Sequence, residues 1–267
     1  AAEQLAAALK SDDADLRGMA ARGLSQFGSH PDIVGPALLA TLQDSDPAVV
    51  GHALDAIAAL GPKILPKVIE GLKDKARRPF AAALIYRMGP QAAPTVPALI
   101  EALREPPANE DDVLFRRQAQ LALAAIGPEA KDAVGVLIES LASEEREVRG
   151  TACYALGKMG PAAAAAVPAL QQRLQDADDA AHTAVIWSLL KIRPGDADLE
   201  KTAVPLLVQA LNREEELVRV EAAAALGGLA AAAEPSVVAR LKELAEKDPS
   251  DQVREAAAEA VKKLEAK

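Results

Sequence analysis

Residues 134–160 read VGVLIESLASEEREVRGTACYALGKMG and contain one complete copy of a repeated unit. An apolar segment is followed by an acidic turn, and then by a second apolar segment that opens with Val148 and Arg149. Residues 96–127 and 203–230 repeat this order, the first of them with an insertion in its turn. Self-similarity at a period of about 20–50 residues is typical of solenoids and other repeat architectures. These copies therefore predict a repeat protein.

The arginine that opens the second segment sets one register for the whole chain. Its equivalents are spaced 28 to 38 residues apart, and six of the eight are arginines: Arg17, Arg78, Arg116, Arg149, Arg219 and Arg254. The residues three, seven and ten positions later are apolar in every copy. Offsets of 3, 7 and 10 fall on one face of an α-helix. The register predicts an all-α fold of about eight helical hairpins.

Glycine and proline mark the predicted ends of these helices. Glycine at offset 11 fits a left-handed C-cap, and it occurs in five copies, at Gly28, Gly61, Gly89, Gly127 and Gly160. Proline is tolerated in a first helical turn, and first helices are predicted to open with Pro36, Pro66, Pro97, Pro168 and Pro205. We expect a single solenoid over 1–267, with repeats at approximately 1–28, 29–61, 62–89, 90–127, 128–160, 161–193, 194–230 and 231–267.

Two motifs carry a resemblance to a known family. Asp44-Ser45-Asp46-Pro47-Ala48-Val49 and Glu147-Val148-Arg149 each precede an alanine-rich helix that ends in glycine. This pattern resembles the HEAT-repeat family, especially the short bacterial HEAT-like repeats of phycobilisome bilin lyases. The resemblance implies a right-handed α-solenoid whose second helices line a concave groove. It also implies that the repeat arginines pair with acidic turn residues of the same or an adjacent repeat, so we expect their role to be structural.

Three repeats depart from the pattern. The third, around residues 71–78, lacks the acidic turn, and the fourth carries an insertion at residues 105–112. The seventh follows an extended linker, which we expect at residues 194–198. Insertions in solenoids map to exposed loops, sometimes on the binding face.

Composition argues against several classes of function. The net charge of −9 disfavours a nucleic-acid partner, which needs a basic surface. No apolar run reaches the roughly 18–20 residues that span a bilayer, so we expect no membrane insertion. The chain begins at Ala1 rather than Met, so we expect that upstream residues, with a signal peptide as one option, were removed. The compartment therefore stays open between the cytoplasm and export.

Motifs for catalysis and metal binding are sparse. The three histidines lack metal-ligand spacing, and neither a P-loop nor a nucleophile elbow occurs. Cys153 lies near the core face of its helix, where we expect a small buried thiol rather than a nucleophile. We therefore expect no catalytic residues, no metal and no cofactor.

The candidate binding site lies at offset five, which points away from the core. This column reads Arg22, Asp55, Ala83, Leu121, Tyr154, Trp187, Ala224 and Glu259. Exposed Trp, Tyr and Arg dominate interface hot spots. We expect the apolar and aromatic residues, together with nearby basic ones, to form a partner-binding surface of Tyr86, Arg87, Arg117, Leu121, Tyr154, Lys158, Trp187 and Lys191.

Several interpretations of this surface stay open. The first is a non-catalytic scaffold that binds a protein or peptide segment, with an acidic one favoured by the basic edge. The second is a small-molecule or tetrapyrrole handling subunit that resembles the bilin lyases. A deep pocket near Trp187 would favour the small molecule, and an open groove would favour a protein. A third, DNA binding, is opposed by the acidic Asp55 and Glu259 toward the two ends of the column. Alternatively, the rings only fill the space between adjacent inner helices.

Overall fold

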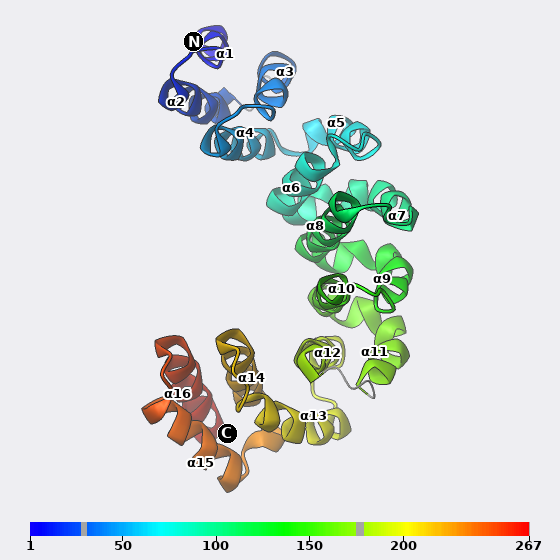
Figure 1. Ribbon diagram of the computed structural model, residues 1–267, viewed down its shortest axis with the longest axis vertical. Helices are drawn as coiled ribbons and strands as arrows, with labels where there is room; N and C mark the ends of the chain where they lie inside the picture. The colour runs from blue at the N-terminus through cyan, green and yellow to red at the C-terminus, as the bar shows by residue number, and fades with distance from the viewer. Residues whose placement is uncertain (28–30, 175–178, 267) are drawn as a thin grey trace. The chain divides into compact units, whose positions relative to one another are not determined.

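The computed structural model describes residues 1–27, 31–174 and 179–266, and every regular element within these ranges is a helix (Figure 1). The chain divides into two compact units, Ala1–Ser140 and Leu141–Lys267. No single described helix is long and apolar enough to cross a bilayer. Segments Pro47–Ala59 and Gly61–Leu72 reach the length and apolar composition of a membrane span only when they are taken as a pair. The chain bends by 110° between them.

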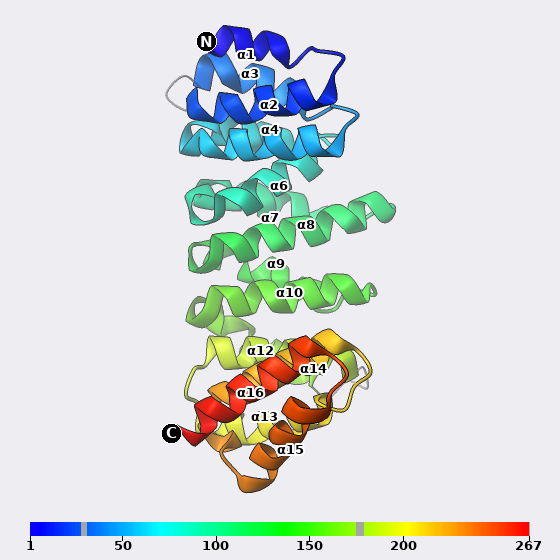
Figure 2. The ribbon, with the colours of Figure 1, turned by 90° about the vertical axis from the view of Figure 1, so that its left-hand side faces the viewer.

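The first unit is built from stacked helical hairpins. Its even-numbered helices pack side by side, α2 on α4, α4 on α6 and α6 on α8 (Figure 2). Helices α1, α3, α5 and α7 each pack beside the helix that follows them in the hairpin. The bounds are α1 Ala2–Ala8, α2 Ala14–Leu24, α3 Pro31–Thr41, α4 Pro47–Ala59, α5 Leu65–Leu72, α6 Arg78–Met88, α7 Val96–Arg104, α8 Glu110–Ile126 and α9 Val134–Ser140.

The second unit repeats this arrangement. Helix α10 packs closely on α12 and α14 packs closely on α16, whereas the contact between α12 and α14 is smaller. The bounds are α10 Arg146–Met159, α11 Val167–Arg173, α12 Asp179–Ile192, α13 Ala197–Ala210, α14 Glu216–Gly228, α15 Pro235–Lys247 and α16 Asp251–Glu265. Every predicted repeat range thus holds two α-helices, although the predicted repeat boundaries themselves stay a prediction.

The predicted core columns are confirmed. The residues at offsets 3, 7 and 10 are buried throughout, apart from Phe27 and Val261, which are half-buried. These two residues belong to the first and last predicted repeats. Burial of small and branched side chains in successive layers is what holds each unit together.

Five glycines were predicted to end second helices. The structure describes four of them, and Gly28 lies outside the described residues. Gly61, Gly89, Gly127 and Gly160 all have a positive φ. The predicted left-handed cap is nevertheless wrong at the last three, because their ψ lies between −134° and −139°. A proline follows each of them, and proline disfavours a helical ψ in the residue before it.

The predicted prolines at helix starts are confirmed at Pro66, Pro97 and Pro168. Pro36 and Pro205 instead lie inside α3 and α13. Helix α13 starts early because the side chain of Asp196 accepts a hydrogen bond from the backbone N–H of Leu199 at 3.1 Å. Two residues of the predicted linker, 197 and 198, therefore belong to the helix.

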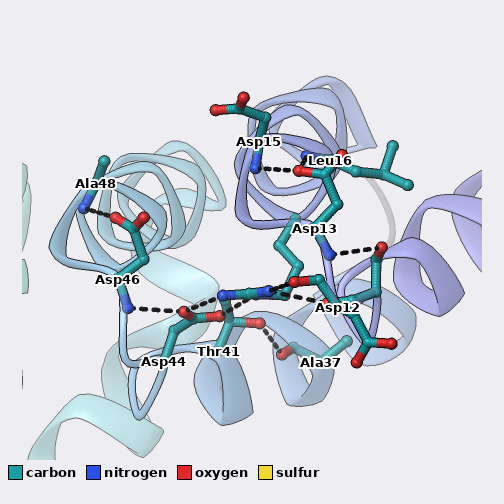
Figure 3. A network of polar contacts seen from close by, with 11 residues as sticks. Asp12, Asp13, Asp15, Leu16, Ala37, Thr41, Asp44, Asp46 and Ala48 are labelled. Carbon is teal, nitrogen blue, oxygen red and sulfur yellow. Dashed lines mark hydrogen bonds and ion pairs between the residues drawn. The ribbon is translucent and has the colours of Figure 1, made fainter.

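Half-buried ion pairs join consecutive repeats. In the first unit, the Arg17 guanidinium binds both carboxylate oxygens of Asp44, at 2.6 and 2.8 Å, and donates from Nη1 to the carbonyl oxygens of Ser11 and Asp12. Asp44 also accepts a hydrogen bond from the backbone N–H of Asp46, whose side chain caps α4 (Figure 3). One arginine thus connects its own turn to the turn of the next repeat.

The second unit builds the same junction from Arg219 and Asp248, whose two hydrogen bonds measure 3.0 and 3.1 Å. The Arg219 guanidinium also donates to the carbonyl oxygens of Arg213 and Glu214. The predicted structural role of the arginine column is confirmed here. The acidic side chain comes from the next repeat, whereas the arginine's own turn contributes backbone carbonyls. Arg149 likewise donates to the carbonyl oxygens of Ser143 and Glu144 in its own turn.

Candidate partner-binding surfaces

An aromatic pair lies on adjacent second helices of the second unit. Tyr154 of α10 and Trp187 of α12 stack with their ring centroids 5.4 Å apart and their planes at 15°. The ammonium of Lys191 lies 5.8 Å from the centroid of the Trp187 ring. Tyr154 is 40% exposed, and Trp187 is half-buried. The structure therefore brings together three of the four predicted residues in this unit, and the fourth, Lys158, is exposed one turn after Tyr154.

Gly157 makes room for this stack. A Cβ atom at this position would lie 2.7 Å from Cε3 of Trp187 and 3.1 Å from Cα of Ser188. The Trp187 ring therefore rests against the bare backbone of α10. The hydroxyl of Ser188 is buried at the same place, with the carbonyl oxygens of Cys153 and Ala184 both 2.7 Å away. The interpretation that the rings fill space between helices thus holds for one side of the pair, while the other side stays exposed.

We refer to Tyr154, Lys158, Trp187 and Lys191 as the aromatic surface. Neither lysine forms an ion pair with any residue in the described part of the chain. Their charges are therefore available to a partner.

A hollow of about 350 Å³ lies beside the aromatic surface, between α12 and α14. Its walls include Trp187, Lys191, Glu200, Glu221 and Ala224. Ala224 is the offset-five residue that follows Trp187 in the column, so a small side chain succeeds the largest one and leaves space. We call this feature the Trp187 hollow.

The two carboxylates of the hollow differ in their surroundings. Glu200 accepts a hydrogen bond from the backbone N–H of Ala231 at 3.2 Å. No hydrogen bond or ion pair reaches the Glu221 carboxylate from the residues that the structure describes. Desolvation by the surrounding protein raises the pKa of Glu221, although the residue as a whole is exposed. The hollow thus has one carboxylate without a partner among the described residues.

The other four predicted residues lie on α6 and α8 of the first unit. Tyr86 is 54% exposed, and Leu121 is half-buried. Arg87 is already paired, because its Nε lies 2.7 Å from the carboxylate of Asp55. Arg117 is half-buried, and its Nε forms no hydrogen bond among the described residues. The predicted row of Leu121, Tyr154 and Trp187 is thus divided between the two units.

Cys153 is the buried thiol that the sequence predicts. Its side chain is in the core, and desolvation raises its pKa to about 12. The thiol is therefore protonated at neutral pH and is not activated for attack. Within the described ranges, no group of three or more His, Cys, Asp or Glu side chains is arranged to hold a metal ion.

Gly157 and Glu221 are site residues that the sequence reasoning missed. For Gly157 a signal existed, since offset eight is glycine only here and at Gly227. Glycine inside a helix is unfavourable by about 1 kcal/mol and usually has a packing reason. For Glu221 no signal existed, because its environment depends on the spacing of α12 and α14.

Comparison with known proteins places the repeats in a family. A family model for HEAT repeats matches residues 2–89, 96–190 and 167–262. The chain belongs to the HEAT-repeat family. No match was found among curated proteins.

Solved structures of other proteins share features of this fold to different degrees. An engineered protein of the Northeast Structural Genomics Consortium is 22% identical, with a TM-score of 0.54 over 98% of this chain and 78% of that one. A chain from the structure of Kap95p with RanGDP is 13% identical, with a TM-score of 0.65 over 98% of this chain and 41% of that one. A chain of the CpcE–CpcF complex of phycocyanin lyase from a Nostoc species is 22% identical, with a TM-score of 0.47 and coverage of 99% and 94%. The chain is thus an all-α repeat solenoid.

Proposed function

We propose that this HEAT-repeat chain is a non-catalytic scaffold that binds a segment of a partner protein on its second helices. HEAT repeats are commonly protein-interaction scaffolds, and their fold is typically non-enzymatic. The observation that supports the proposal most is the partly exposed stack of Tyr154 on Trp187. Tyrosine and tryptophan, with arginine, carry most of the binding energy in protein interfaces.

The rigidity of the aromatic surface supports binding. Trp187 is fixed between Tyr154 and the backbone at Gly157, so little side-chain freedom is lost when a partner contacts it. Lys158 and Lys191 lie beside the rings without acidic partners among the described residues, which favours acidic groups on the partner segment.

The first unit offers a second set of contacts in Tyr86, Arg87, Arg117 and Leu121. We give it a smaller part in the proposal, because Arg87 must leave Asp55 before it can pair with a partner. Variants in this set are therefore expected to weaken binding less than variants of the aromatic surface.

The tetrapyrrole alternative has some support from the Trp187 hollow. Its volume of about 350 Å³ lies at the lower end of the range for small-molecule sites, about 300–1,000 Å³. The carboxylates of Glu200 and Glu221 would repel the propionate groups of a tetrapyrrole, so we place this function second. A bilin that binds would change its absorbance and the fluorescence of Trp187, and we expect neither change.

The test is affinity capture from source cells with three forms of the full chain. These are the wild type, the Tyr154→Ala/Trp187→Ala double variant, and Leu217→Ala as a matched control. Leu217 is 67% exposed and lies outside the predicted surfaces. We expect the double variant to lose partners that the wild type and the control retain, while circular dichroism shows that all three are folded. Identical captured proteins from all three would refute the proposal.

A further inference from the structure

We infer that the Trp187 hollow receives the cationic end of a lysine or arginine side chain from the partner segment. This inference rests on the proposed function and adds one anchor residue to it. It goes beyond the acidic partner that the two exposed lysines favour, because it assigns a positive charge to one position of the bound segment.

The walls of the hollow suit such a side chain. The indole of Trp187 on α12 forms one wall of the hollow. Ala224 and Gly228 line it from α14, and their small size leaves space there. An alkyl stem can lie along these apolar groups, since lysine and arginine bury their stems while their charged ends seek polar groups. A bulky acid or an uncharged polar group would gain less from the same walls.

The charges of the hollow also favour a cationic side chain. Glu221 has no partner in the described chain, and the protein around it removes part of its hydration. A partly desolvated carboxylate gains from an incoming ammonium or guanidinium, and the nearby face of an indole attracts the same cation. Glu200 adds a second negative charge at the rim, although its side chain is engaged with the Ala231 N–H.

The side chain of Lys191 competes with an incoming cation for the Trp187 ring. Its ammonium already lies over the Trp187 ring, 5.8 Å from the centroid, and the side chain is exposed without an ion pair to any described residue. A lysine stem is flexible, so it can turn away when another cation enters. Removal of this charge should therefore strengthen the binding of a cation to the hollow and weaken the binding of an anion.

The experiment uses Nα-acetyl-lysine amide and Nα-acetyl-arginine amide, whose side chains keep their positive charge, as probes on the full chain. Trp187 is the only tryptophan, so its indole N–H resonance reports directly on the hollow. The matched controls are N-acetyl-norleucine amide, which has an apolar stem without the charge, and N-acetyl-glutamate amide. We expect saturable shifts of the indole resonance with the two cationic probes and not with the two controls.

Three variants make the test specific. Glu221→Gln should weaken binding of the cationic probes by about tenfold, because it removes a charge-assisted contact. Ala224→Leu fills the hollow at an exposed position and should abolish binding. Lys191→Met should strengthen binding severalfold. Equal shifts with the norleucine probe, a preference for the glutamate probe, or an unchanged Glu221→Gln variant would each overturn the inference.

The outcomes separate this inference from the proposed function. If the double variant of the aromatic surface loses its protein partners but the cationic probes do not bind, the scaffold stands and the inference is wrong. If the probes bind but the double variant keeps its partners, the hollow is a cation site and the proposed function is wrong.

Discussion

At the scale of single residues, one glycine decides the shape of the candidate surface. The stack of Tyr154 on Trp187 depends on the missing side chain at Gly157, where the ring of Trp187 takes the space that a Cβ would occupy. The sequence predicted that both aromatic residues face outward. It could not predict that they touch, because that depends on how closely α10 and α12 approach.

Gly157→Ala should displace the Trp187 ring. We expect a loss of about 1–3 kcal/mol in the free energy of unfolding, which is typical of overpacking, and a red shift of the tryptophan emission. Gly150→Ala is the matched control, since Gly150 lies in the same helix and a Cβ there meets nothing within 4 Å. The control should be neutral or more stable by about 0.5–1 kcal/mol. Equal stability of the two variants by urea denaturation would contradict this packing.

The junction of Arg219 with Asp248 should appear in the pH dependence of stability. Burial alone would raise the pKa of Asp248, but hydrogen bonds from Arg219 and the Ser250 N–H hold it below its ordinary 3.8. A carboxyl whose pKa is lowered by folding stabilises the protein above its unfolded pKa. This contribution disappears as the pH falls through the lower folded pKa. The hydrogen bond from Arg17 lowers the pKa of Asp44 in the same way.

Asp248→Asn should therefore lower the Tm at pH 7 and reduce the loss of stability below about pH 3.8. Asp198→Asn is the control, because the Asp198 side chain is 97% exposed. Calorimetric melts between pH 2 and pH 7 would check this difference. Parallel curves for the wild type and Asp248→Asn would show that the junction does not contribute.

At the scale of elements, the helices and much of their packing follow from the sequence. The offsets of 3, 7 and 10 predicted which faces are buried, because that pattern reflects helical geometry alone. The starts of α3 and α13 were missed, since Pro36 and Pro205 resemble opening residues while the helices begin earlier. The glycine caps were predicted at the right residues with the wrong ψ, which the following proline changes.

Helices α14 and α16 pack closely in the second unit. A Cβ at Gly227 would lie 2.7 Å from the Cα of Ala260, so a side chain there would force two backbones apart. We expect Gly227→Ala to cost about 1–3 kcal/mol and to increase hydrogen exchange in α16. Gly228→Ala, where a Cβ meets nothing within 4 Å, should show neither effect. Unchanged exchange in Gly227→Ala would mean that the two helices separate readily.

At the scale of the whole molecule, the sequence predicted the repeat family and a single binding surface of eight residues. The structure divides these residues into two sets that lie in different units. The column at offset five runs through both compact units, and the contact between Tyr154 and Trp187 occurs within the second. The Trp187 hollow was beyond sequence reasoning. It exists because α12 and α14 make a smaller contact than the pairs on either side, and no residue pattern encodes that spacing.

The central claim is that the aromatic surface binds a partner protein. Its most direct test is the Kd of the captured partner for the wild type, the Tyr154→Ala/Trp187→Ala double variant and Leu217→Ala, measured by titration calorimetry. Hot-spot residues contribute about 2 kcal/mol or more, so the double variant should bind about 30-fold more weakly or worse. Leu217→Ala should match the wild type. A double variant that is folded and binds within about twofold of the wild type would contradict the claim.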